Sequence, residues 1–142
     1  MRRLASLAAV LILAGLAAGL GTAAPTAKIQ LCGQLKGPYA SYTGRFTGQK
    51  LTGSRWTVIA TGVSCAKAMR AAPAILKWWA KARVDQSSRG TLAGGYTCTK
   101  ENDGHGRSGS AGCILTKGTG QTVQLYMTGK YTIEQLKRLF RG

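Results

Sequence analysis

The chain has 142 residues, with 20 lysines and arginines against only four aspartates and glutamates, and a formal net charge of +16 at pH 7. One histidine and four carboxylates are a poor supply of groups that transfer protons, which weighs against acid–base enzyme chemistry. The strong positive charge favours anionic partners such as nucleic acid, cell-envelope polymer, acidic polysaccharide or a membrane surface.

Residues 1–24 have the composition of a signal peptide. Arg2 and Arg3 precede an apolar segment that runs over residues 4–20 and ends in small residues before Pro25. The apolar segment is short for a membrane span, so we predict cleavage near residue 24 and a secreted or cell-envelope protein. The remaining 118 residues keep 18 basic and four acidic side chains, a net charge of +14, and no further stretch long enough to span a bilayer.

Residues 25–53 are predicted to be a glycine- and threonine-rich irregular segment, partly extended, with short β-like pieces around residues 29–32 and 45–51, and Cys32 ties it to the rest of the protein. Residues 54–142 are predicted to form the α+β domain. Its first element is a strand over residues 54–61, because β-branched and aromatic residues gather there and Trp56 alternates with apolar neighbours.

The longest helix is predicted over residues 65–83, with Ser64 as its N-cap. Pro73 is expected to kink it or divide it in two, because proline cannot donate a hydrogen bond to the preceding turn. A helical wheel separates an apolar arc, assigned to the core, from a basic arc on the opposite side. The apolar arc holds Cys65, Ala68, Met69, Ala72, Ile75, Leu76 and Trp79. The basic arc holds Lys67, Arg70, Lys77 and Lys81, with Trp78 beside it.

Residues 85–95 are predicted to be a connection, and three short strands then follow at 96–100, 112–116 and 121–127. The last helix begins at a capping box formed by Thr132 and Gln135. The predicted order is therefore β-α-β-β-β-α. This order favours a small antiparallel sheet with one or two helices packed on one face.

Four cysteines follow the leader: Cys32, Cys65, Cys98 and Cys113. In an oxidising compartment an even set forms disulfides, and four cysteines allow three pairings. Cys98 and Cys113 lie on adjacent predicted strands, so a cross-strand disulfide is expected there, which leaves Cys32 to pair with Cys65. The spacing contains no C-x-x-C pair and so fits neither a zinc site nor a redox motif.

The sequence GVSCA at 62–66, followed by YTC at 96–98 and a second cysteine strand, resembles a small two-disulfide domain. This domain recurs, without an assigned function, in exported proteins of actinobacteria and relatives. The resemblance covers about residues 54–127 and implies the disulfides Cys32–Cys65 and Cys98–Cys113. It implies no activity, and it does not explain the helix that follows Tyr131.

The one concentration of titratable groups is the loop between Cys98 and Cys113, which contains Glu101, Asp103, His105 and Arg107. A secreted basic ribonuclease could use Glu101 and His105 for proton transfer and Arg107 to stabilise phosphate. Glycine-rich loops of this kind are more often solvated and mobile hairpin tips, which we favour here. Asp103 and His105 are too few to hold a metal, and no cofactor motif is present.

Binding is better supported than catalysis. Trp78 could stack on a base or a sugar while the neighbouring lysines meet phosphate or carboxylate. Trp78 could equally cover the Cys32 segment or the Pro73 region, with the lysines forming an ordinary solvated face. We predict an exported, non-catalytic module that binds an anionic polymer, either cell-envelope polymer or nucleic acid. The alternatives are the ribonuclease-like enzyme and a secreted inhibitor or effector that binds a protein.

Overall fold

The computed structural model describes residues 27–44, 48–84, 89–92, 94–115 and 120–141. Within these ranges, only the backbone of Arg89 and Phe140 is described. The predicted signal peptide, residues 1–24, lies outside this range. Among the described residues, no helix is both long enough and apolar enough to cross a bilayer.

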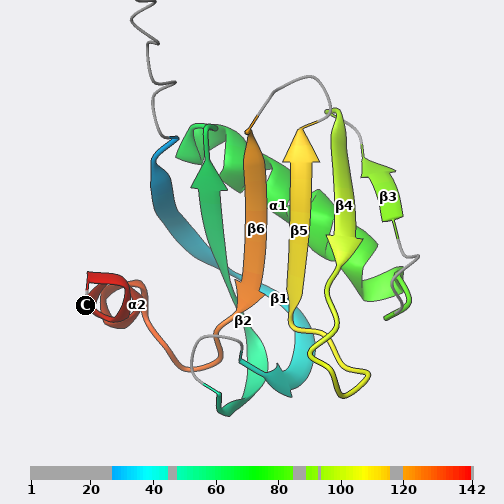
Figure 1. The fold of residues 1–142 in the computed structure, drawn as a ribbon, viewed down its shortest axis with the longest axis vertical. Coiled ribbons are helices and arrows are strands. Elements are labelled where there is room, and N and C mark those ends of the chain that lie inside the picture. The colour runs from blue at the N-terminus through cyan, green and yellow to red at the C-terminus, as the bar shows by residue number, and fades with distance from the viewer. Residues whose placement is uncertain (1–26, 45–47, 85–88, 93, 116–119, 142) are drawn as a thin grey trace, which may run out of the picture.

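The fold is a six-stranded antiparallel sheet with two helices, a mixed α+β architecture that the sheet dominates (Figure 1). The strand order is β1-β2-β6-β5-β4-β3. The elements in chain order are β1 (Ile29–Thr43), β2 (Lys50–Thr61), α1 (Cys65–Lys81), β3 (Arg89–Leu92), β4 (Tyr96–Lys100), β5 (Ser110–Leu115), β6 (Thr122–Met127) and α2 (Ile133–Arg141). Figure 1 shows α1 running across the back of the sheet, while α2 lies off to one side.

The core lies between α1 and the inward-facing residues of the sheet. Trp56 and Val58 on β2 are fully buried, as are Leu125 and Met127 on β6. The ring of Trp56 meets that of Trp79 edge to face, with 4.8 Å between the ring centroids. Alternate residues of a strand point to opposite faces, so the sequence alternation on 54–61 and 121–127 correctly predicted which side chains face the core.

Helix α1 begins as predicted, since the Ser64 hydroxyl accepts a hydrogen bond from Lys67 N at 3.3 Å. The alternative in which Pro73 divides the helix in two is wrong, because one helix spans Cys65–Lys81. Pro73 lies on the exposed side, where water can solvate the carbonyl that proline leaves without a donor. The buried members of the predicted apolar arc are Ala68, Ala72, Ile75, Leu76 and Trp79.

The prediction of an irregular segment over residues 25–53 is wrong for most of its length. Residues Ile29–Thr43 form strand β1, which pairs with β2 at the edge of the same sheet. The glycines that suggested irregular structure have a packing role: a Cβ on Gly37 would lie 2.5 Å from the Trp56 ring and 2.8 Å from Leu76. Glycine therefore lets the strand approach the core closely.

A second strand was also missed in the predicted order β-α-β-β-β-α. Within the expected connection 85–95, Arg89–Leu92 forms β3, the other edge of the sheet. A Cβ on Gly90 would collide with the indole of Trp78. A four-residue strand with glycine at such a contact carries too little alternation for sequence analysis to detect.

Both expected disulfides, Cys32–Cys65 and Cys98–Cys113, are present. Cys32–Cys65 joins β1 to the first turn of α1, and Cys98–Cys113 joins directly paired residues of β4 and β5. Two disulfides fit an oxidising compartment.

The capping box of α2 is confirmed. Thr132 N donates to Gln135 Oε1 at 2.8 Å, and Gln135 N donates to Thr132 Oγ1 at 3.3 Å. Of the apolar residues on this helix, Leu136 is buried, but Leu139 is 60% exposed. The helix contacts β1 and lies to one side of the sheet (Figure 1).

Candidate functional site

The basic arc of α1 forms an exposed surface, called here the α1 surface. It comprises Lys67, Arg70, Lys77, Trp78 and Lys81. The four cations are exposed, and the buried face of the helix lies on the opposite side. The wheel prediction therefore placed the charges correctly.

The described carboxylates are all engaged away from the α1 surface. Glu101 accepts a hydrogen bond from the Ser110 hydroxyl at 3.0 Å. Asp103 forms an ion pair with Arg107, and Glu134 forms one with Lys137. Within the described ranges, then, the α1 cations have no carboxylate to neutralise them.

Trp78 lies at the edge of the α1 surface and is half-buried. Its indole covers Gly90 of β3. Part of the ring is thus committed to packing against the sheet edge. Lys77 directly precedes Trp78 in the helix, and Lys81 follows it by about one turn.

Lys100 is a cation that the sequence analysis did not single out. Its Nζ donates to the carbonyls of Trp79 and Ala82, at 2.9 and 2.8 Å, where α1 ends. It also lies 4.0 Å from the centroid of the Trp79 ring. Burial lowers the pKa of Lys100 below its ordinary value. This lysine holds the C-terminal end of α1, a position that favours positive charge.

The loop between β4 and β5 is built around Asp103, whose side chain is 2% exposed. Its oxygens accept hydrogen bonds from the backbone N–H groups of Thr43 and His105 at 2.8–2.9 Å and from that of Arg107 at 3.2 Å. Burial alone would raise the pKa of Asp103, but these hydrogen bonds and the Arg107 charge hold it below the ordinary value. The loop is thus internally bonded and tied to β1, which differs from the loose hairpin tip that its glycines suggested.

The ordered loop does not assemble the ribonuclease-like groups. Glu101 bonds to Ser110, Arg107 pairs with Asp103, and the His105 residue is exposed. In the part of the chain that the structure describes, no hydrogen bond or ion pair joins the side chains of Glu101, His105 and Arg107 to one another. Nor does any group of three or more His, Cys, Asp or Glu side chains there lie close enough to hold a metal ion.

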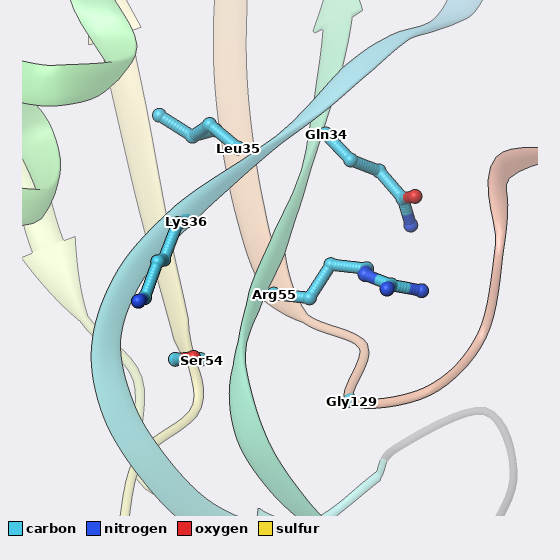
Figure 2. A pocket seen from close by; sticks show the side chains of 6 residues that line it. All are labelled: Gln34, Leu35, Lys36, Ser54, Arg55 and Gly129. Atoms are coloured by element: carbon cyan, nitrogen blue, oxygen red, sulfur yellow. The ribbon is translucent and has the colours of Figure 1, made fainter.

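The structure adds a pocket that the sequence analysis missed. It lies between β1, β2 and the turn after β6, and has a volume of about 440 Å³ (Figure 2). Gln34 and Arg55 reach into this region from neighbouring strands. Sequence alone gives no sign of the pocket, because it depends on the pairing of strands and on the path of the chain beyond β6.

Comparison of the chain with protein-family models, with curated proteins and with solved structures found no match in any of the three. Function is therefore inferred from the surfaces and contacts of this chain alone.

Proposed function

We propose that the protein is an exported, non-catalytic module that binds an anionic polymer through the α1 surface. The observation that carries this proposal is the exposure of Lys67, Arg70, Lys77 and Lys81 along one face of a helix, with no carboxylate partner among the described residues. The polymer is a cell-envelope polymer or a nucleic acid, whose phosphates or carboxylates repeat along a chain.

The anchoring of α1 supports this role. Its N-terminal turn is fixed by Cys65, which is bonded to Cys32, and its C-terminal end by Lys100. A surface held at both ends loses little conformational entropy on binding, so more of the electrostatic attraction appears as affinity. Neutralising polymer charges releases counterions, and binding should weaken steeply as salt is added.

Export is supported by the two disulfides and by the composition of residues 1–24. The resemblance to small secreted two-disulfide domains points the same way. Cell fractionation tests this part of the proposal: the protein should be found outside the cytoplasm, with its N-terminus near residue 25. Retention of the intact leader in the cytoplasm would contradict it.

The polymer site is tested with the double variant Lys77→Ala/Lys81→Ala. Binding to nucleic acid, teichoic-type polymer, acidic glycan and anionic vesicles is measured between about 50 and 200 mM salt. The matched control is Lys50→Ala/Lys130→Ala, which removes the same charge from two exposed positions elsewhere. The α1 variant should lose affinity at least about tenfold more than the control. An equal loss in both variants would reduce the site to non-specific charge attraction, and no salt-sensitive binding by the parent protein would refute the proposal.

The contribution of Trp78 is tested by Trp78→Leu, which keeps an apolar cover over Gly90 and removes the aromatic ring. A base or sugar that stacks on the ring should then bind about tenfold less tightly. Unchanged affinity would mean that Trp78 only packs against β3 and that the lysines and the arginine bind the polymer without it.

The ribonuclease alternative has one observation in its favour, the order that Asp103 gives the loop. It predicts cleavage of a fluorogenic RNA that His105→Ala abolishes. Absence of cleavage by the parent protein from mildly acidic to neutral pH would remove it. A protein-binding inhibitor would instead present this ordered loop as a rigid contact surface.

A further inference from the structure

A pocket on the face of the sheet away from α1 has the features of a small-ligand site. On β2, Trp56 faces α1, so its neighbours Arg55 and Thr57 point to the opposite face. The pocket is about 440 Å³, enough for a sugar-sized molecule. Its lining residues are Gln34, Leu35, Lys36, Ser54, Arg55 and Gly129.

One wall of the pocket is a fixed polar cluster. Gln34 Nε2 donates to the Tyr131 carbonyl at 2.8 Å and to Thr57 Oγ1 at 3.0 Å. The hydroxyls of Thr57 and Thr128 lie 2.8 Å apart, and both residues are buried. The cluster therefore joins β1, β2 and the chain leading to α2, and it holds the amide of Gln34 in one orientation.

That orientation decides what Gln34 offers a ligand. The carbonyl of Tyr131 can only accept a hydrogen bond, so the group that faces it must be the amide NH₂. The Gln34 carbonyl oxygen is left without a partner among the described residues. It is therefore an acceptor available to a hydroxyl group.

Arg55 supplies the charge. Figure 2 shows Gln34 and Arg55 pointing toward the turn that carries Gly129, while Leu35 and Lys36 point away from it. One guanidinium nitrogen of Arg55 donates to the Lys130 carbonyl at 3.4 Å. A guanidinium has five N–H donors, so this bond orients the group and leaves most of its donors for a ligand.

We propose that this pocket binds a sugar acid, with its carboxylate held by Arg55 and a hydroxyl of the same sugar bonded to Gln34. A single guanidinium matches a carboxylate in both charge and planar geometry, through two parallel hydrogen bonds. The free acceptor on Gln34, which lines the same pocket, selects a ligand that carries a hydroxyl donor as well as its acid group. The pocket and the α1 surface lie on opposite faces of the sheet. The sugar-acid site therefore does not depend on whether the α1 surface binds a polymer.

The test is an NMR titration of the purified, disulfide-bonded protein with D-glucuronate, and separately with glucose, acetate and inorganic phosphate. Glucuronate should shift the side-chain signals of Arg55 and Gln34 to saturation, about tenfold more tightly than the other three probes. Equal affinity for acetate, or tighter binding of phosphate, would overturn the proposal in favour of a simple anion site. Equal affinity for glucose would show that the carboxylate is not recognised.

Variants locate the site. Arg55→Ala should abolish glucuronate binding, and Arg55→Lys, which keeps the charge but not the fork of donors, should weaken it about tenfold. The matched control is Arg138→Ala, an exposed arginine on α2, which should bind as the parent does. Unchanged binding by Arg55→Ala would overturn the assignment. Lys77→Ala/Lys81→Ala should retain glucuronate binding, which separates failure of this site from failure of the α1 surface.

Discussion

The two helices of this protein are held in place by different kinds of contact. Helix α1 has 17 residues and buries an apolar row that ends in Trp79, which packs against Trp56. Helix α2 has nine residues, and Leu136 is its one buried side chain among those described. Burial in the shared core makes α1 part of the cooperative unit, because it cannot separate without exposing the apolar face of the sheet.

Polar contacts near its N-terminus position α2 instead. Gln34 bonds to the carbonyl of Tyr131, and the capping box of Thr132 and Gln135 begins the helix. Such contacts contribute little net free energy individually, but they fix direction. We therefore expect substitutions in α1 to lower the stability of the whole domain, whereas substitutions in α2 should affect only the local opening of that helix.

The largest effect is expected from Trp79→Ala. Trp79 is buried, stacks edge to face on Trp56 and donates from its Nε1 to Ser108 Oγ at 3.1 Å. Removing it should lower the free energy of unfolding by about 3–5 kcal/mol, measured by denaturant titration. Leu139→Ala on α2 is the control and should cost less than about 0.5 kcal/mol. Comparable losses from the two variants would break the distinction between the helices.

Next is the disulfide that anchors the start of α1. Cys32→Ala/Cys65→Ala opens a closure of 33 residues and should cost about 2–5 kcal/mol of unfolding free energy. Thermal or denaturant unfolding of the oxidised proteins measures this loss. The parent protein under strong reductant loses both disulfides and should be destabilised at least as much. A variant as stable as the parent would show that burial alone holds α1.

Asp103 should make the stability of the protein depend on pH in the acid range. It orders the loop between β4 and β5, and this loop bonds to the end of α1 through Trp79 Nε1. A carboxyl with a depressed pKa in the folded state stabilises the fold above its unfolded pKa, which is about 3.9. That contribution is lost as the pH falls through the folded pKa. Asp103→Asn should therefore cost about 1–2 kcal/mol at neutral pH, and the difference from the parent should shrink below about pH 4. A difference that does not change with pH would contradict this account.

The smallest effects come from making the same kind of change at the two N-caps. Ser64 bonds to Lys67 N and Thr132 bonds to Gln135 N, each at 3.3 Å. Ser64→Ala should lower global stability by about 1 kcal/mol. Thr132→Ala should instead speed amide hydrogen exchange in α2 and leave the unfolding midpoint nearly unchanged. Equal global losses would show that α2 unfolds together with the sheet.

Sequence reasoning succeeded where local periodicity and the final contacts agree. The apolar row of α1, the alternation on β6, the capping box at Thr132 and both disulfides were predicted from the sequence. Strand β1 was missed because Gly33 and Gly37, which suggested irregular structure, are glycines that let the strand lie against α1. Such a close approach is a property of the assembled layers and leaves no local pattern.

The candidate sites divide in the same way. Exposure of the α1 cations followed from the helical wheel, whereas the order of the loop around Asp103 did not, because its bond to Thr43 crosses 60 positions. The pocket at Arg55 depends on Gln34, Thr57 and Tyr131 meeting across separations of 23 and 97 residues. A single sequence provides no means of predicting such long-range contacts.

The disulfides join the first cysteine to the second and the third to the fourth. A chain that enters an oxidising compartment N-terminus first presents its cysteines in this same order. An oxidase that simply links each new thiol to the preceding free one would therefore reach the native pairing directly. Maturation of this protein should require a thiol oxidant but no disulfide isomerase, since the order of synthesis already selects one of the three pairings.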